Sequence, residues 1–160
     1  MSITVNLKAL EATHFFWVAT KGREKIGEQY ISSITVMPEM KPLFADDFNE
    51  ESIRKVLSSI SNREMFSWTK KEAKFWNSNL WVFEDWSLME SVVAKLKELN
   101  LSDLESLTGD LEVVVIPGHV DPVYKSEGKL TLNYFKFNVT EDGALTFDGV
   151  PVKEYIKSQL

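Results

Sequence analysis

Reactive side chains are scarce in this sequence of 160 residues. Cysteine is absent, which excludes disulfides, thiolate zinc sites, iron–sulfur clusters and a cysteine nucleophile. The two histidines are His14 and His119, and the second lies with Asp121 just after the apolar run 113–116. Loops that follow strands often carry function, and an imidazole titrates near neutral pH. We therefore treat His119 and Asp121 as candidates for acid–base catalysis, and His14, His119 and Asp121 as candidates for a metal site.

The string VVIPGHVD, residues 114–121, resembles a segment of metallo-β-lactamase-type hydrolases in which a strand leads into a Pro-Gly-His turn. Those enzymes also need a His-x-His-x-Asp-His cluster, which this chain lacks, so we do not assign it to that family. We favour a structural interpretation in which Pro117 and Gly118 shape a turn, and we predict no metal ion and no cofactor. A metal-assisted or acid–base hydrolase that uses His119 and Asp121 is the alternative.

Aromatic side chains are concentrated between residues 66 and 86, where four of the five tryptophans lie. Helical spacing places Trp76, Leu80 and Phe83 on one face, which is typical of a core stripe. Trp81 lies on another face, which favours contact with a partner or a small ligand as a second interpretation. The candidate contact residues are Trp68, Trp81, Trp86, Asn77 and Asn79.

Standard catalytic motifs are missing from the chain. It contains no Gly-x-Ser-x-Gly elbow, no Gly-x-Gly-x-x-Gly, no phosphate loop and no His-Glu-x-x-His. Carboxylates are numerous, and spacing alone singles out no pair of them for acid–base work. We therefore favour a non-enzymatic protein.

The formal charge of −6 is unevenly distributed. Residues 1–80 carry 11 Lys and Arg against 10 Asp and Glu, a net of +1, whereas residues 81–160 carry 7 against 14, a net of −7, with no arginine. A nucleic-acid binder needs a basic face, so we predict no nucleic-acid partner. The acidic half fits a role in solubility, and it also leaves open an acidic inhibitor or immunity-type protein.

Nothing in the chain predicts insertion into a membrane. The longest apolar stretches, 15–19 and 113–117, are far shorter than the roughly 20 residues of a spanning helix, and residues 1–10 lack the pattern of a signal peptide. We expect a soluble protein in the cytoplasm with no membrane partner.

The chain reads as a strand-rich region 1–40, a helical region 47–108 and a strand-rich region 111–148 that ends in a short helix 151–160. Alternation predicts a strand at 2–7, and aromatic and β-branched residues predict a hairpin of strands 13–20 and 28–36. A helix near 7–18 is the alternative, because Leu7, Leu10, His14 and Val18 would share a face.

The helical region has the clearest pattern. Ile53, Val56, Leu57 and Ile60 form one apolar stripe, and Asn49 is a candidate cap for its helix. Capping boxes are predicted at 69–72, 87–90 and 102–105. In the last region, 113–116 predicts a strand covered on both faces, and 129–139 predicts one long strand with a bulge or with burial on both sides.

These patterns predict a single domain of the α+β class over 1–160. An antiparallel or mixed sheet is built from N- and C-terminal strands, and the helical region 47–108 packs on it. The predicted function is a soluble, non-enzymatic interaction module that binds another protein, or a second copy of itself, through an aromatic or acidic face.

Overall fold

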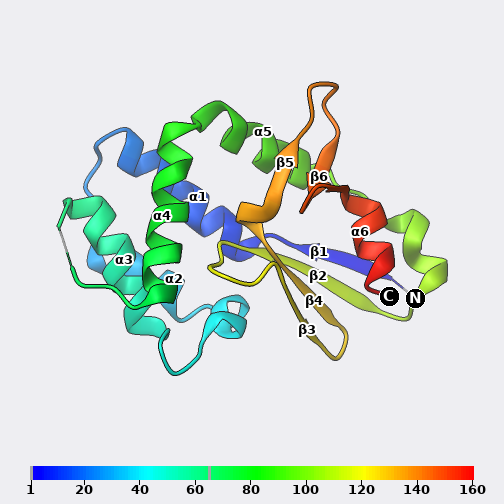
Figure 1. Cartoon of the computed structure of the whole chain (residues 1–160), viewed down its shortest axis with the longest axis horizontal. Coiled ribbons are helices and arrows are strands. Elements are labelled where there is room, and N and C mark those ends of the chain that lie inside the picture. Colours follow the sequence, from blue (N-terminus) through cyan, green and yellow to red (C-terminus); the bar gives the residue numbers. More distant parts are fainter. Residues whose placement is uncertain (1, 65) are drawn as a thin grey trace.

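The computed structural model describes residues 2–64 and 66–160. Met65, which falls inside the predicted helical region, lies outside them. A sheet occupies the middle of the molecule in Figure 1, and α1 to α4 gather beside it. The helices are α1 (Lys8–Lys21), α2 (Glu28–Thr35), α3 (Glu50–Asn62), α4 (Lys70–Glu84), α5 (Trp86–Lys97) and α6 (Val152–Ser158), with shorter 3-10 helices η1 (Pro38–Leu43), η2 (Ser102–Leu107) and η3 (Tyr134–Lys136).

The first sheet has the strand order β1-β2-β4-β3. Its strands are β1 (Ile3–Asn6), β2 (Leu111–Ile116), β3 (Val123–Ser126) and β4 (Lys129–Asn133). β1 and β4 run parallel to β2, whereas β3 pairs with β4 in an antiparallel hairpin. Residues 113–116 of β2 are buried on both faces of the sheet, as their continuous apolar run predicted.

The two faces of this sheet differ, because side chains along a strand alternate in direction. One face carries Val113, Val115 and Leu132, all fully buried, and contributes to the hydrophobic core. The opposite face carries Glu112 beside Lys129 at one end and the buried Val114 and Ile116 farther along. Residues of η1 line the same groove as Glu112 and Val114, so η1 lies over this face.

The second sheet is a small antiparallel one with the order β5-β6-β7, formed by β5 (Phe137–Val139), β6 (Leu145–Phe147) and β7 (Val150–Pro151). The prediction of one long strand over 129–139 is therefore wrong. The chain leaves the first sheet at η3, because the Asn133 side chain accepts a hydrogen bond from the Phe135 amide and turns the backbone. The apolar face switches at this turn.

The predicted hairpin of strands 13–20 and 28–36 is also wrong, because both segments are helices. Leu10, Thr13, Phe16 and Trp17 form the buried face of α1, and their spacing is helical. Aromatic and β-branched residues favour strands only when they fit a pleated surface, and here burial on a helix overrides that preference. The helical alternative for residues 7–18 was closer to the structure.

The predicted helix starts are confirmed at α3 and α4. Asn49 accepts a hydrogen bond from the Ser52 amide at 3.1 Å, and Thr69 forms the expected capping box with Glu72. The boxes at 87–90 and 102–105 are wrong. Ser87 lies inside α5, which begins directly after α4, and η2 starts without a side-chain cap.

The structure confirms the α+β class, with strands near both ends of the chain and helices in the middle. The first helix begins at Lys8, well before the helical region predicted over 47–108. Among the residues described, no helix combines the length and hydropathy needed to cross a bilayer.

Candidate functional site

A cleft lies at the edge of the first sheet where parallel strands β2 and β4 end, and we call it the carboxyl-edge cleft. Its volume is about 270 Å³. His119 enters it from the loop after β2, and the 3-10 turn after β4 and one face of α4 supply the rest of the lining. In open sheets with parallel strands, ligands bind preferentially outside the carboxyl ends of the strands. The other lining residues are Lys74, Asn77, Ser78, Trp81, Phe135 and Lys136.

Asn133, the last residue of β4, holds the sheet side of this cleft in place. Its side chain is fully buried, and the carboxamide oxygen accepts from the amides of Gly118 at 3.1 Å and Phe135 at 3.0 Å. The amide nitrogen donates to the carbonyls of His119 and Asp121, both at 3.2 Å. One side chain thereby fixes the loops after β2 and β4, and these bonds satisfy backbone groups that would otherwise be buried without partners.

Gly118 lets the loop approach this amide. A Cβ atom at position 118 would lie 2.7 Å from Cγ of Asn133, closer than carbon atoms pack. Because four hydrogen bonds hold Asn133, its side chain has no free direction in which to give way. We call Asn133, Gly118 and the backbone groups they position the Asn133 cluster.

His119 is part of this structure and has no free ring nitrogen. Its Nε2 donates to the Leu43 carbonyl at 2.9 Å, and its Nδ1 accepts from the Val120 amide at 2.7 Å. This pattern requires the neutral tautomer protonated at Nε2. Burial lowers the pKa of His119, although the bond to Leu43 opposes part of the shift. The ring also packs edge-on against Phe48, with centroids 4.6 Å apart.

The three candidate metal ligands do not form one site. His14, on α1, pairs with Glu90 of α5 at 2.8 Å. The carbonyl of Asp121 is bound to Asn133, and its side chain is exposed. In the described part of the chain, no group of three or more His, Asp and Glu side chains is placed to hold a metal ion. The geometry gives no support to the hydrolase alternative.

Two aromatic rings, those of Phe135 and Trp81, line the cleft. Phe135 is held by Trp17 and Tyr134, whose ring centroids lie 6.1 Å and 5.5 Å from its own. Trp81, on α4, is half-buried and lines the cleft as the sequence suggested for a contact residue. A planar group between these rings would remove apolar surface from water on both of its faces.

The charged residues of the cleft lining are the lysines Lys74 and Lys136, and no carboxylate lines it. Over residues 2–64 and 66–160, neither lysine forms an ion pair with Asp or Glu. Asn77 and Ser78 add hydrogen-bonding groups. The cleft therefore offers positive charge and aromatic surface together, in a chain whose overall charge is negative.

The other predicted contact residues lie outside the cleft. Asn79 is fully buried, where its Oδ1 accepts from the Trp17 indole at 2.9 Å, so it is structural. Trp86 lies against Phe83, and Lys21 of α1 sits over its ring. Trp68 contacts the rings of Phe66 and Trp76. Of the five proposed contact residues, the structure brings Trp81 and Asn77 together.

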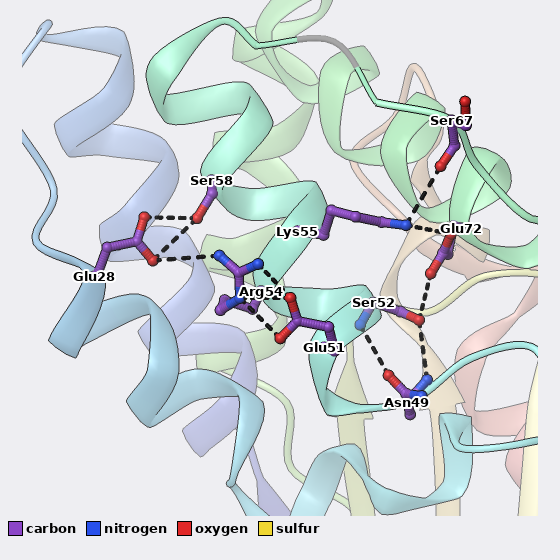
Figure 2. A network of polar contacts seen from close by, with 9 residues as sticks. All are labelled: Glu28, Asn49, Glu51, Ser52, Arg54, Lys55, Ser58, Ser67 and Glu72. Atoms are coloured by element: carbon purple, nitrogen blue, oxygen red, sulfur yellow. Dashed lines mark hydrogen bonds and ion pairs between the residues drawn. The ribbon is translucent and has the colours of Figure 1, made fainter.

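A second buried polar cluster lies on the far side of α4 and is drawn in Figure 2. The Glu72 carboxylate accepts from the Ser52 hydroxyl at 2.6 Å, from Lys55 at 3.0 Å and from the Thr69 amide at 3.0 Å. Burial alone would raise the pKa of Glu72, but these three donors together lower it. This Glu72 cluster joins α3 to α4, and the contact between Ser58 and Glu28 extends the polar contacts to α2.

Sequence reasoning missed the residues that build the cleft from the β4 side. Phe135 and Lys136 were placed inside a strand, although they follow its end. Asn133 had a readable signal, because a lone amide closes the apolar run 130–132 and has to find partners if it is buried. No local pattern in the sequence shows that Gly118 is its neighbour.

Comparison of the chain with protein family models, curated proteins and solved structures returned no match. The function is therefore argued from the geometry of the chain alone.

Proposed function

We propose that the protein is a non-enzymatic interaction module that binds another polypeptide. It recognises an aromatic residue at the C-terminus of that partner. The carboxyl-edge cleft receives that residue, with the ring between Trp81 and Phe135 and the terminal carboxylate beside Lys74 and Lys136. The observation that carries the proposal is that two lysines, free of ion pairs among the described residues, line the same cleft as two aromatic rings.

The chemistry of the cleft favours binding over catalysis. The titratable side chains of its lining are the two lysines and His119, and both ring nitrogens of His119 are engaged by backbone groups. Ser78 is the hydroxyl of the lining, and a serine nucleophile needs a base that can take its proton. His119 has no lone pair to spare for that role.

The size of the cleft favours a single residue of a partner. Small-molecule and cofactor sites usually occupy roughly 300–1,000 Å³, and the carboxyl-edge cleft is smaller, at about 270 Å³. One aromatic side chain with its carboxylate fills such a space. Charge-assisted hydrogen bonds to the carboxylate are stronger than neutral ones, so the acid group is expected to contribute much of the selectivity.

The test is titration of the protein with the peptide acetyl-Ala-Ala-Ala-Phe, followed by calorimetry, beside the same peptide with a C-terminal amide. We expect the acid to bind and the amide to bind about 10-fold more weakly, because the amide loses the charge-assisted bonds, worth roughly 1.5 kcal/mol. Equal binding of the two peptides, or none of either, contradicts the proposal.

Three variants locate the site. Lys136→Gln and Trp81→Ala should each weaken binding of the acid several-fold, whereas Lys125→Gln, an exposed lysine of β3 outside the cleft lining, should leave it unchanged. Phenylacetate tests the nature of the partner. If phenylacetate binds and the peptide does not, the ligand is a free small acid and the polypeptide partner is excluded.

A further inference from the structure

A separate cavity of about 400 Å³ lies where the last turns of α1 and α3 meet, and we call it the arginine cavity. Its lining includes Arg23, Lys25 and Arg63. The chain has three arginines, so two of them line this one cavity. It shares no residue with the carboxyl-edge cleft, and the proposal that follows does not depend on the proposed function.

Both arginines stand in a left-handed backbone conformation. Arg23 has a φ of 58° and Arg63 a φ of 57°, each just after a helix ends. This position normally belongs to glycine, since a side chain is strained there. Gly22 directly precedes Arg23, yet the arginine takes the left-handed position. Strain of this kind clusters at ligand-binding sites, where the surrounding structure maintains it.

The charges around the arginine cavity favour an anion. The lining holds three cationic side chains and one carboxylate, that of Glu24, which gives a formal balance of +2. The two helix ends contribute about half a negative charge each, so roughly +1 remains. Neither Arg23 nor Arg63 forms an ion pair with an acidic side chain in the described residues.

The uncharged groups of the lining narrow the class of anion. Ser61 and Asn62 supply hydrogen-bonding groups, and Thr20 has a buried hydroxyl without a partner among the described residues. Ile60 is the apolar residue of the lining, which contains no aromatic ring on which a nucleobase could stack. The planar fork of arginine matches the oxygens of a phosphoryl group.

We propose that the arginine cavity binds the phosphate monoester of a small polyhydroxy compound. The phosphoryl group lies between Arg23 and Arg63, and the hydroxyl groups contact Ser61 and Asn62. A nucleotide fits less well, because its base would find no stacking partner.

The experiment is calorimetric titration of the full-length protein with glycerol 3-phosphate and, in parallel, with adenosine monophosphate. We expect glycerol 3-phosphate to bind at least as tightly as the nucleotide. In the double variant Arg23→Gln/Arg63→Gln, the affinity should fall at least 10-fold. Lys125→Gln removes one positive charge elsewhere and should change it less than 2-fold. No binding of glycerol 3-phosphate, or equal loss in the double variant and the control, overturns the proposal.

Arg63→Gly separates binding from folding. Glycine adopts the left-handed conformation without strain, so this variant should melt no lower than the parent chain, and about 2 °C higher if the relief of strain dominates. It should still lose affinity for glycerol 3-phosphate several-fold. Unchanged affinity in Arg63→Gly overturns the role of this arginine.

The same phosphoryl chemistry occurs on lipid headgroups, and vesicles distinguish the two sources. Co-sedimentation with phosphatidylcholine vesicles that contain phosphatidylinositol 4-phosphate would identify a lipid headgroup as the source. Binding of glycerol 3-phosphate without co-sedimentation would identify a free metabolite. Either result supports the arginine cavity only if the double arginine variant weakens that binding at least 10-fold.

Discussion

Two buried polar clusters hold segments of this molecule together, one around the neutral amide of Asn133 and the other around the charged carboxylate of Glu72. Asn133 makes four hydrogen bonds, all to backbone groups of the loops beside the carboxyl-edge cleft. Glu72 binds two side chains and one backbone amide, and it joins two helices (Figure 2).

The difference lies in what each cluster makes rigid. The neutral amide of Asn133 is hydrogen-bonded to backbone groups through both its oxygen and its nitrogen. These bonds set the path of the two loops, and because the amide does not titrate, they do so independently of pH. A buried carboxylate beside a lysine holds helices together, but its strength depends on ionisation. Sites that must keep one shape are better supported by rigid, fully satisfied groups. The comparison therefore identifies Asn133 as the residue that preorganises the cleft.

The largest expected effect is that of Asn133→Leu, which keeps the branching of the side chain at Cγ and removes all four bonds. Two amides and two carbonyls lose their partner, and we expect the free energy of unfolding to fall by about 4 kcal/mol. Urea denaturation measures this loss. Asn77→Leu, on the exposed face of α4, is the matched control and should change stability by less than about 0.5 kcal/mol. Similar losses of stability in both variants would show that the four hydrogen bonds of Asn133 have no special role in holding the fold.

Gly118→Ala is expected to destabilise the protein by about 2 kcal/mol, because the new methyl group meets the fixed Asn133 side chain. The double variant Gly118→Ala/Asn133→Ala sharpens the interpretation. Once Asn133 is shortened, the methyl group has room, so the double variant should lose less stability than the sum of the two single variants. Additive losses would mean that the contact is not the source of strain.

The sequence predicted the parts of the fold in which local signals and burial agree. The strand 113–116, the helix stripe 53–60 and the capping box 69–72 combine pattern and composition, and all three are confirmed. The strand prediction for residues 13–20 failed. Their β-branched and aromatic side chains favour a strand locally, but contacts with distant segments bury them on a helix. Trp17 shows this directly, since its partner Asn79 is 62 residues away.

The carboxyl-edge cleft could be predicted only in part, for a similar reason. His119, Trp81 and Asn77 were singled out by residue type, but their meeting depends on where β2 and α4 lie in space. The hydrogen-bond partner of His119 was also hidden, because Leu43 is 76 residues away. Residue chemistry identified participants, and tertiary structure decided which of them meet.

Glu72→Gln tests the charged cluster and is expected to cost about 1.5 kcal/mol at pH 7. The neutral amide can still cap α4, but Lys55 loses its anionic partner in a buried place. Lys71→Gln is the control, since its ion pair with Asp47 is more exposed and should contribute less than about 1 kcal/mol. Both losses are read from chemical denaturation, and an equal cost for the two variants would contradict the special role of Glu72.

The smallest effects concern pH, and they separate His119 in the cleft from the Glu72 cluster. The pKa of His119 is lowered by burial from an ordinary value of 6.5, so the unfolded chain binds a proton first. Stability should therefore decline as the pH falls below about 6.5, by at most about 1.4 kcal/mol per pH unit for a single group.

The pKa of Glu72 is lowered from 4.5 by its three donors, despite its burial, so its stabilising charge is lost as the pH falls through a lower range. We expect His119→Gln to flatten the decline in stability that begins as the pH falls below 6.5, and Glu72→Gln to flatten the decline that begins below pH 4.5, in denaturation curves recorded at each pH. If His119→Gln left the upper range unchanged, the neutral state of that ring would not be what the folded chain requires.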